Sequence, residues 1–456
     1  MPFAATADSL AFDSPLAIGV LATIALLLVV VLACELRNVP KSLLVLMAAA
    51  FLDMVGLFMV MPILPFYVKA FAADGVTLFG EQIAAGTLTG LVVSSFTIAQ
   101  LLSAPWWGRL SDRRGRRPVL LIALAASAVA FLLFGFAESL WLVMLSRIVQ
   151  GAGGGTVGVI QSYVADSVEP AERARALGWL SAATNLGVAL GPVLGSLAVT
   201  LGTHDLLPGV GELRLGRAAP GVAASLLCVL NIVFAWRWLR ESKAATPRTH
   251  PQSKPLAAAV QVFAQPGAPA ARLLLIYAIA IGAAQGVNPT MVLYLESRFG
   301  VTEQTIGYLF MYIGALSVFA RVLVLGRAVD RFGEVKLSRM GLVTLATGLG
   351  TLPFAASLPQ LAGAVALLPL GMAMTFPCLT SMLSRVVSAA DRGLYMGLQQ
   401  SFGGVARLCA PLAYGIAYDL IGREAPFVFA AVVVASTLLL GFGLGASVPP
   451  KSVKSV

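Results

Sequence analysis

Apolar stretches of about twenty residues recur along the whole chain, and they constrain its fold more than any other feature. A helix needs about 20 mostly apolar residues to cross a hydrocarbon core of roughly 30 Å. The chain has 456 residues, of which 58% are hydrophobic and only 11% charged, whereas a soluble protein has about a quarter charged. We therefore predict an all-α polytopic membrane protein. Its helices are expected at residues 16–34, 42–65, 85–107, 118–137, 139–161, 176–200, 219–238, 272–295, 304–326, 337–357, 359–382, 394–418 and 425–446.

Basic residues fall mainly on one side of the predicted membrane. The loop at 108–117 is taken as cytoplasmic and the sides alternate along the chain, which places most of the 31 Lys and Arg in cytoplasmic loops. An excess of Lys and Arg is typical of cytoplasmic loops, so the net charge of +10 indicates topology and not a nucleic-acid partner. The exceptions, predicted outside or within helices, are Lys69, Arg214, Arg217, Arg298, Arg423, Arg147, Arg321 and Arg407.

Metal, redox and ATP chemistry lack the sequence patterns that they need. The four Cys do not have the paired spacing of a zinc or redox motif. His204 and His250 lie in predicted loops on opposite sides of the membrane. No phosphate-binding glycine loop occurs. We expect no metal, no cofactor and no enzymatic activity.

Residues 1–38 are expected to form an extra N-terminal transmembrane helix. Residues 1–34 contain two Asp but no Lys or Arg, so the basic segment of a secretory signal is missing. Arg37 and Lys41 follow the apolar stretch instead. This polarity favours an uncleaved helix with its N-terminus outside, and a cleaved leader is the alternative.

An internal repeat divides the rest of the chain. The segment "GRLSDRRG" at 108–115 recurs as "GRAVDRFG" at 326–333, so the repeated unit spans six helices and both copies enter the membrane in the same orientation. Two matched bundles suit alternating access around a central site. Between the copies, "RESKAATPRTHPQSKP" has the composition of a linker. We predict two six-helix bundles, at 39–240 and 271–456 with a short tail, joined by a cytoplasmic linker at 241–270.

The repeated loop resembles the signature loop between the second and third core helices of major facilitator superfamily transporters. It reads Gly108, three residues, Asp112-Arg113, one residue, then Gly115-Arg116-Arg117-Pro118. The resemblance covers about residues 42–446 and implies the major facilitator fold. It also implies a conformational latch between the cytoplasmic faces, and a loop that merely carries positive charge is the alternative. The expected latch residues are Gly108, Asp112, Arg113, Gly115, Arg116, Arg117, Gly326, Asp330, Arg331 and Gly333.

The segment "RIVQGAGGG" resembles the fourth core helix of the same family. An arginine this deep in a bilayer is costly unless it faces water or a partner. By resemblance to proton-coupled members, Arg147 and Gln150 are expected to take part in proton coupling. A purely structural arginine is the alternative.

The helix at 176–200 resembles the antiporter motif of drug/proton exchangers. Small residues three or four positions apart let a neighbouring helix approach closely, and a proline can bend the helix. Ordinary helix packing produces similar faces, so it stays an alternative. The motif residues are Gly178, Gly187, Gly191, Pro192 and Gly195, with Ser196 where the family has a second glycine.

The segment "FLDMVGLFMVMPILPF" resembles the first core helix of the drug/proton antiporter branch, which includes tetracycline exporters. Asp53 lies about eleven residues into this helix, roughly 16 Å along it and near mid-membrane. A desolvated carboxyl group can load and release protons near neutral pH. We expect Asp53 to carry the coupled proton with Arg147 as its electrostatic partner. An aspartate satisfied within a helix contact is the alternative.

These observations predict a proton-coupled exporter of amphipathic or drug-like small molecules that works by alternating access. An organic-anion or metabolite transporter of the same fold is the alternative, because Arg147 and Arg407 outnumber the one deep acid. A non-transporting sensor would not need the paired loops. The expected cavity residues, chosen as polar or aromatic residues inside helices or as the unmatched arginine, are Gln100, Gln285, Asn288, Tyr312, Gln399 and Arg407.

The expected partners are a small-molecule substrate, protons and the lipid bilayer, and we expect a monomer. By resemblance the membrane is a bacterial inner membrane. The charge bias places the linker and the C-terminus in the cytoplasm.

Overall fold

The computed structural model describes most of the chain after the first forty residues. The extra N-terminal helix predicted at 16–34 lies outside the described residues, and so does the end of the C-terminal tail. In the described part, all regular structure is helical except for a short hairpin in which β1 (Thr77–Leu78) pairs antiparallel with β2 (Glu81–Gln82). The described residues are 41–73, 75–78, 81–154, 156–168, 172–202, 215–239, 241, 255–388 and 391–444.

The described helices follow the predicted apolar windows in order. Seven of them are long and apolar enough to cross a membrane. Three shorter apolar helices are α6, α12 and α17. In the first half the helices are α2 (Lys41–Val60), α3 (Leu64–Ala72), α4 (Ala85–Arg114), α5 (Arg116–Gly135), α6 (Leu140–Gly153), α7 (Thr156–Ser167), α8 (Arg173–Gly202), η3 (Gly216–Ala218) and α9 (Ala219–Trp238).

The second half shows the same order, preceded by a short helix from the predicted linker. A π-helical turn, η4, interrupts the helix predicted at 304–326. The elements are α10 (Pro255–Ala264), α11 (Pro269–Phe299), α12 (Ile306–Phe319), η4 (Ala320–Val324), α13 (Leu325–Phe332), α14 (Glu334–Thr351), η5 (Leu352–Phe354), α15 (Leu358–Val386), α16 (Arg392–Leu420) and α17 (Ala425–Leu440).

The chain packs into two compact units, and each contains segments from both halves of the sequence. Unit 1 contains Met1–Asp74, Ile98–Pro247 and Val292–Ala315, and unit 2 contains Gly75–Thr97, Arg248–Met291 and Leu316–Val456. The start of α4 therefore packs with second-half helices, and α12 packs with first-half helices.

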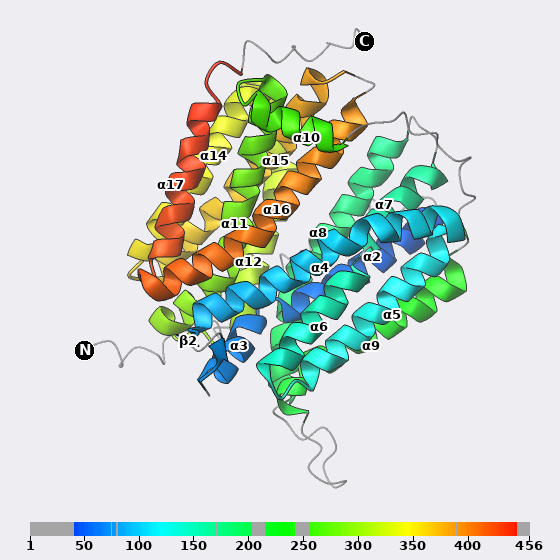
Figure 1. Cartoon of the computed structure of the whole chain (residues 1–456), viewed down its shortest axis with the longest axis vertical. Coiled ribbons are helices and arrows are strands. Elements are labelled where there is room, and N and C mark those ends of the chain that lie inside the picture. Colours follow the sequence, from blue (N-terminus) through cyan, green and yellow to red (C-terminus); the bar gives the residue numbers. More distant parts are fainter. Residues whose placement is uncertain are drawn as a thin grey trace. The chain divides into compact units, whose positions relative to one another are not determined.

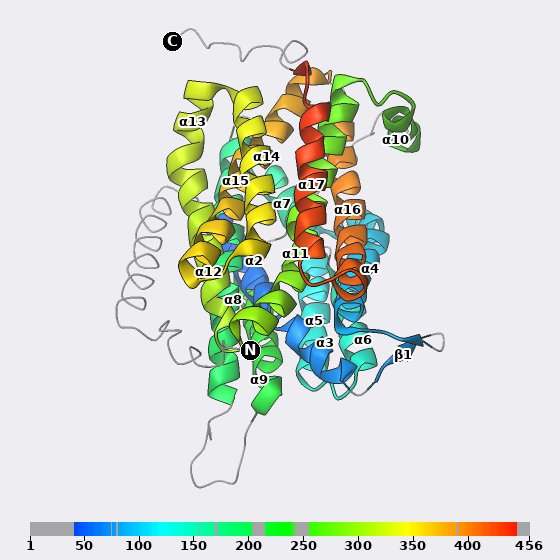
Figure 2. The same cartoon turned by 90° about the vertical axis from the view of Figure 1, so that its left-hand side faces the viewer.

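Within each unit, a few helix pairs supply most of the packing. In unit 1, α2 packs against α8 and α9, and α5 packs along α9 (Figure 1). In unit 2, α14 packs between α15 and α17 (Figure 2). The buried apolar cluster of unit 1 runs from Leu43 in α2 to Leu239 after α9.

The repeated loop is mostly helical, which differs from the predicted loop at 108–117. α4 continues to Arg114 and α5 begins at Arg116, so only Gly115 separates them. Gly115 has φ 97° and ψ 160°, and Gly333 between α13 and α14 has φ 74° and ψ 158°. Such angles are accessible essentially only to glycine. The apolar window ends where charges begin, but backbone hydrogen bonds continue until the glycine breaks them.

Candidate functional site

Asp53 lies in the middle of α2 and is almost completely buried. Its exposed fraction is 7%, because α8 and α9 both pack against α2. The carboxylate lies within electrostatic range of the Cys228 thiol on α9. One helical turn earlier, Asn231 Nδ2 on α9 donates to the Ala49 carbonyl at 2.8 Å. Asp53 is therefore held inside the helix contact of unit 1 and not against lipid.

The glycines of α8 bring that helix directly against the backbone of α2. A Cβ atom at Gly187 would lie 2.7 Å from the Phe51 carbonyl oxygen, and one at Gly191 would lie 2.8 Å from that of Val55. Gly195 meets Met59 in the same way, whereas Gly178 has nothing within 4 Å. Pro192 lies inside the same helix. The close approach therefore runs along α2 from just before Asp53 to beyond it.

Ser196 links α8 to α12 at the predicted extracellular ends. Its hydroxyl donates to the Glu303 carbonyl at 2.8 Å and accepts from the Gly307 N–H at 2.9 Å. In the antiporter motif, Ser196 stands where the family has a second glycine. Its structural role could not be found from the sequence, because its partners lie more than a hundred residues away.

Arg147 is fully buried in α6, with an exposed fraction of 0%. Its guanidinium carbon lies 5.1 Å from the ring centroid of Phe134 and 6.0 Å from that of Phe131. Nε donates to the Ser146 hydroxyl at 3.3 Å, but Nη1 and Nη2 have no hydrogen-bond partner among the described residues. The electrostatic partnership of Arg147 with Asp53 stays a prediction. Aromatic faces offset part of the cost of the buried charge.

Two glutamine side chains, Gln150 and Gln100, lie near the end of α6. Gln150 is buried, and its Oε1 has no hydrogen-bond partner in the described part of the chain. Gln100 Nε2 on α4 donates to the Gly154 carbonyl at 3.3 Å, just after α6. Gln150 lies three residues after Arg147 on α6, and Gln100 reaches the end of the same helix from α4.

The first copy of the latch sequence forms a local ion pair and one long-range cap. Asp112 pairs with Arg116 at 2.7 Å. Glu241 Oε1 accepts from the backbone N–H of Arg116 at 2.7 Å and of Arg117 at 3.3 Å, so it caps the start of α5. A Cβ at Gly115 would lie 2.7 Å from that carboxylate. Glu241 was missed from the sequence, because it lies in the predicted linker, 125 residues after Arg116.

In the second copy, the junction between the two helices has different charged partners. Gly326, Asp330, Arg331 and Gly333 are exposed. The residue after Gly333, Glu334, pairs with Arg385 and accepts from the Ser381 hydroxyl. Arg113 and Gly108 of the first copy are also exposed. The repeated sequence thus gives the same glycine backbone but different charge partners.

Two polar residues mark one exposed face of the otherwise buried helix α11. Between residues 271 and 295, Gln285 and Asn288 are the only exposed positions. Gly282 and Gly286 lie against Ala406 and Ala410 of α16. Exposed positions on a membrane helix are apolar where they meet lipid, so this polar face is suited to a water-filled cavity.

The remaining cavity candidates differ in their surroundings. Arg407 on α16 is half-buried. A Cβ atom at Gly403 would lie 3.5 Å from Arg407 Nη1 and 3.0 Å from the Tyr277 ring of α11, so the three residues lie close together. Gln399 on α16 is buried and accepts from the Thr380 hydroxyl at 3.3 Å. Tyr312 on α12 is half-buried in unit 1. Unit 2 thus brings Arg407, Gln285 and Asn288 onto two helices that pack together.

Long apolar helices, a buried carboxylate, a buried arginine and a polar face on a central helix define a polytopic membrane transporter. The chain belongs to the Major Facilitator Superfamily, whose sequence profile matches residues 46–322 and 273–455. It is a multi-pass membrane transporter and not an enzyme.

Relatives cover most of the chain. The class B tetracycline resistance protein of Escherichia coli is 28% identical over 368 residues, which are 81% of this chain and 86% of that protein. Multidrug resistance protein 2 of Bacillus subtilis is 24% identical over 409 residues, 88% of this chain and 93% of that protein. The crystal structure of the human organic anion transporter MFSD10 has a TM-score of 0.63 at 24% identity and covers 88% of this chain and 100% of that one.

Proposed function

We propose that this protein exports amphipathic or drug-like small molecules in exchange for protons by alternating access. Asp53 is the observation that carries the proposal. It is a mid-helix carboxyl group that is 7% exposed, and ionisable groups inside membrane segments are functional candidates. Similarity to tetracycline and multidrug resistance proteins supports drug-like cargo.

Arg147 is proposed to set the proton affinity of Asp53. A buried cation that lacks hydrogen bonds on two nitrogens is costly to keep, which a purely structural role does not explain. Its positive charge favours the ionised form of a nearby carboxyl group. Deprotonation of Asp53 toward the cytoplasm would then be promoted when the site faces inward.

Cross-half contacts at one end of the helices support alternating access. Ser196 of α8 bonds to residues before and in α12 within unit 1. Asp419 of α16 bonds to the first turn of α4 within unit 2. Both contacts lie at the ends that the charge bias predicts to be extracellular. In the proposed cycle these contacts would open and close together with the outer ends of the helices, and the latch loops would close the opposite ends.

The predicted bacterial inner membrane, the cytoplasmic linker and C-terminus, and the monomeric state belong to this proposal. Inverted membrane vesicles with an imposed pH gradient test its core. We expect gradient-driven uptake of tetracycline or of the cationic dye ethidium by the wild type. Asp53→Asn should abolish the response to the gradient while substrate exchange without a gradient persists. Asp391→Asn, at an exposed carboxylate just before α16, is the matched control.

A flux with full pH dependence in Asp53→Asn would remove Asp53 from the coupling mechanism. The alternative cargo is an organic anion, favoured by half-buried Arg407 beside Tyr277 and by the buried guanidinium of Arg147. A binding survey across substrates of different charge separates the two cargos. Preference for carboxylates that is lost in Arg407→Gln would favour the anion.

A further inference from the structure

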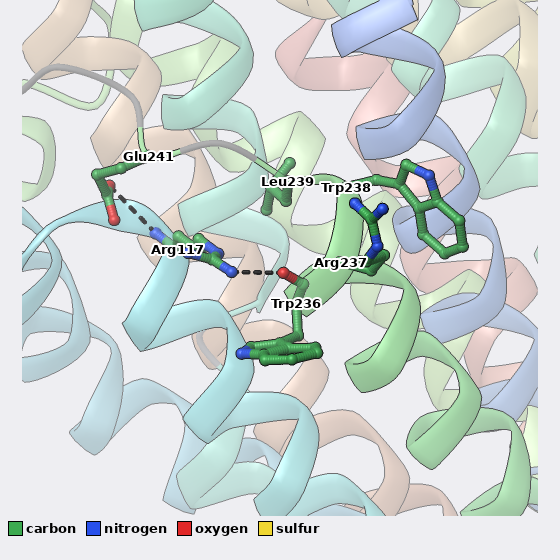
Figure 3. Close-up of a pocket in the computed structure, with 6 residues that line it drawn as sticks. All are labelled: Arg117, Trp236, Arg237, Trp238, Leu239 and Glu241. Carbon is green, nitrogen blue, oxygen red and sulfur yellow. Dashed lines mark hydrogen bonds between the residues drawn. The ribbon is translucent and has the colours of Figure 1, made fainter.

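A pocket of about 460 Å³ opens at the predicted cytoplasmic end of α9, and it shares Arg117 with the first latch loop. It is lined by residues from the start of α5, from the end of α9 and from the segment directly after α9, namely Arg117, Trp236, Arg237, Trp238, Leu239 and Glu241. Figure 3 shows Arg117 reaching from α5 toward the Trp236 carbonyl of α9, to which it donates a hydrogen bond. The pocket thus spans two helices of unit 1.

Positive charge dominates this pocket. Arg117 and Arg237 contribute two guanidinium groups, and Nε of Arg117 is buried without a hydrogen-bond partner among the described residues. Glu241 is the single carboxylate in the lining, and its Oε1 is already used by two backbone N–H groups of α5. A carboxylate at a helix N-terminus is compensated by the helix dipole. The remaining charge favours an anionic ligand.

The two tryptophans place the pocket at the membrane interface. Trp236 is 63% exposed and Trp238 is 55% exposed, and exposed tryptophans are enriched where headgroups meet the hydrocarbon. The Arg237 guanidinium lies 5.8 Å from the Trp238 ring centroid. An anion bound here would therefore lie at the level of the lipid headgroups.

An apolar stripe continues from the pocket along α9. Its exposed members recur at helical spacing and end at Trp236. They are Leu226, Val229, Leu230, Val233 and Trp236. Free phosphate would not contact this apolar stripe, whereas the acyl chains of a lipid would cover it. Basic pockets on the cytoplasmic side of membrane helices bind anionic headgroups in this way.

We propose that this pocket binds the phosphodiester headgroup of an anionic phospholipid of the cytoplasmic leaflet, with the acyl chains along α9. Arg117 and Arg237 bind the phosphate, and the two indoles hold the glycerol region. The site shares Arg117 with the proposed latch, but it uses neither Asp53 nor Arg147. A lipid bound here would brace the end of α9 against the start of α5, next to the repeated loop.

Native mass spectrometry of the full chain in detergent tests the site, with phosphatidylglycerol, phosphatidylethanolamine and inorganic phosphate as probes. We expect tighter binding of phosphatidylglycerol than of phosphatidylethanolamine. Arg237→Gln, at an exposed side chain, should weaken phosphatidylglycerol binding about fivefold, and adding Arg117→Gln should weaken it further, since each arginine near a membrane surface contributes about a fivefold effect. Arg327→Gln, an exposed arginine elsewhere, is the control of equal charge.

Three results would overturn the proposal. Unchanged phosphatidylglycerol binding in Arg237→Gln and in the double variant would exclude the pocket. An equal loss in Arg327→Gln would show attraction to overall charge only. Displacement of phosphatidylglycerol by millimolar inorganic phosphate would identify an ion site and not a lipid site. Circular dichroism and thermal melts of each variant show whether the fold is intact.

Discussion

Asp419 near the end of α16 caps the first turn of α4 through Thr87. Its Oδ2 accepts from the Thr87 N–H at 2.6 Å and from the Thr87 hydroxyl at 2.7 Å, while Oδ1 accepts from the Gly86 N–H at 3.0 Å. A carboxylate at a helix N-terminus satisfies free N–H groups and interacts favourably with the helix dipole. This contact joins a helix of the first predicted bundle to one of the second.

Asp419→Ala should release the start of α4. The loss of such a cap costs about 1–2 kcal/mol, so opening of this contact should become about five to thirty times more frequent. Hydrogen–deuterium exchange of residues 85–90 measures it. Asp391→Ala, just before the other end of α16, should leave this exchange unchanged. Equal exchange in wild type and Asp419→Ala would contradict the capping role.

Gly191→Ala should destabilise the protein although alanine favours helices. Alanine in place of glycine stabilises a free helix position by about 1 kcal/mol, but the added Cβ at Gly191 would lie 2.7 Å from the Phe58 Cβ. Overpacking of this kind costs about 1–3 kcal/mol. We expect a lower Tm for Gly191→Ala. Gly178→Ala in the same helix meets nothing within 4 Å, and its Tm should stay equal or rise.

Gly115→Ala and Gly333→Ala should both lower stability, the first by more. Both glycines have backbone angles that cost other residues about 1–3 kcal/mol. Only Gly115 would also place its Cβ 2.7 Å from the Glu241 carboxylate. A double-mutant cycle of Gly115→Ala with Glu241→Ala, followed by thermal unfolding, should show positive coupling. Additive effects would show that Glu241 does not crowd this position.

Glu303, in the loop before α12, should make stability depend on pH. Burial raises the pKa of this carboxyl group from its ordinary value of 4.5, Arg217 lowers it, and Glu296 raises it further. The folded protein thus holds this proton more tightly than an unfolded chain does. Its contribution is complete below pH 4.5 and is lost as the pH rises through the raised pKa. The Tm of the wild type relative to Glu303→Gln should therefore fall over that interval, whereas Glu172→Gln at an exposed site should follow the wild type.

Arg147→Met should separate stability from transport. Replacing a buried, incompletely bonded charge by an apolar side chain of similar length stabilises some proteins by about 1–4 kcal/mol. We expect a higher Tm and loss of gradient-driven transport. Arg423→Met, at an exposed arginine, is the control for the charge change. A lower Tm together with normal transport would show that Arg147 serves only packing.

The number and order of the membrane helices could largely be predicted from the local sequence. Apolar windows located every described membrane helix, because the bilayer requires each segment to be apolar over its own length. The repeated glycines were visible as letters, and Gly115 and Gly333 share one backbone conformation. The predicted end of α4 and the predicted start of α5 were wrong, because charged residues can continue a helix beyond the apolar segment.

Partners could not be read in the same way, since they depend on folding. Glu241 is separated from Arg116 by 125 residues, and Asp419 from Thr87 by 332. No local pattern distinguishes these carboxylates from other charged residues at helix ends. Folding chooses among them, because only the packed helices bring a given acid to free N–H groups. The same packing holds Asp53 against α9 and leaves two nitrogens of Arg147 without a hydrogen-bond partner in the described chain.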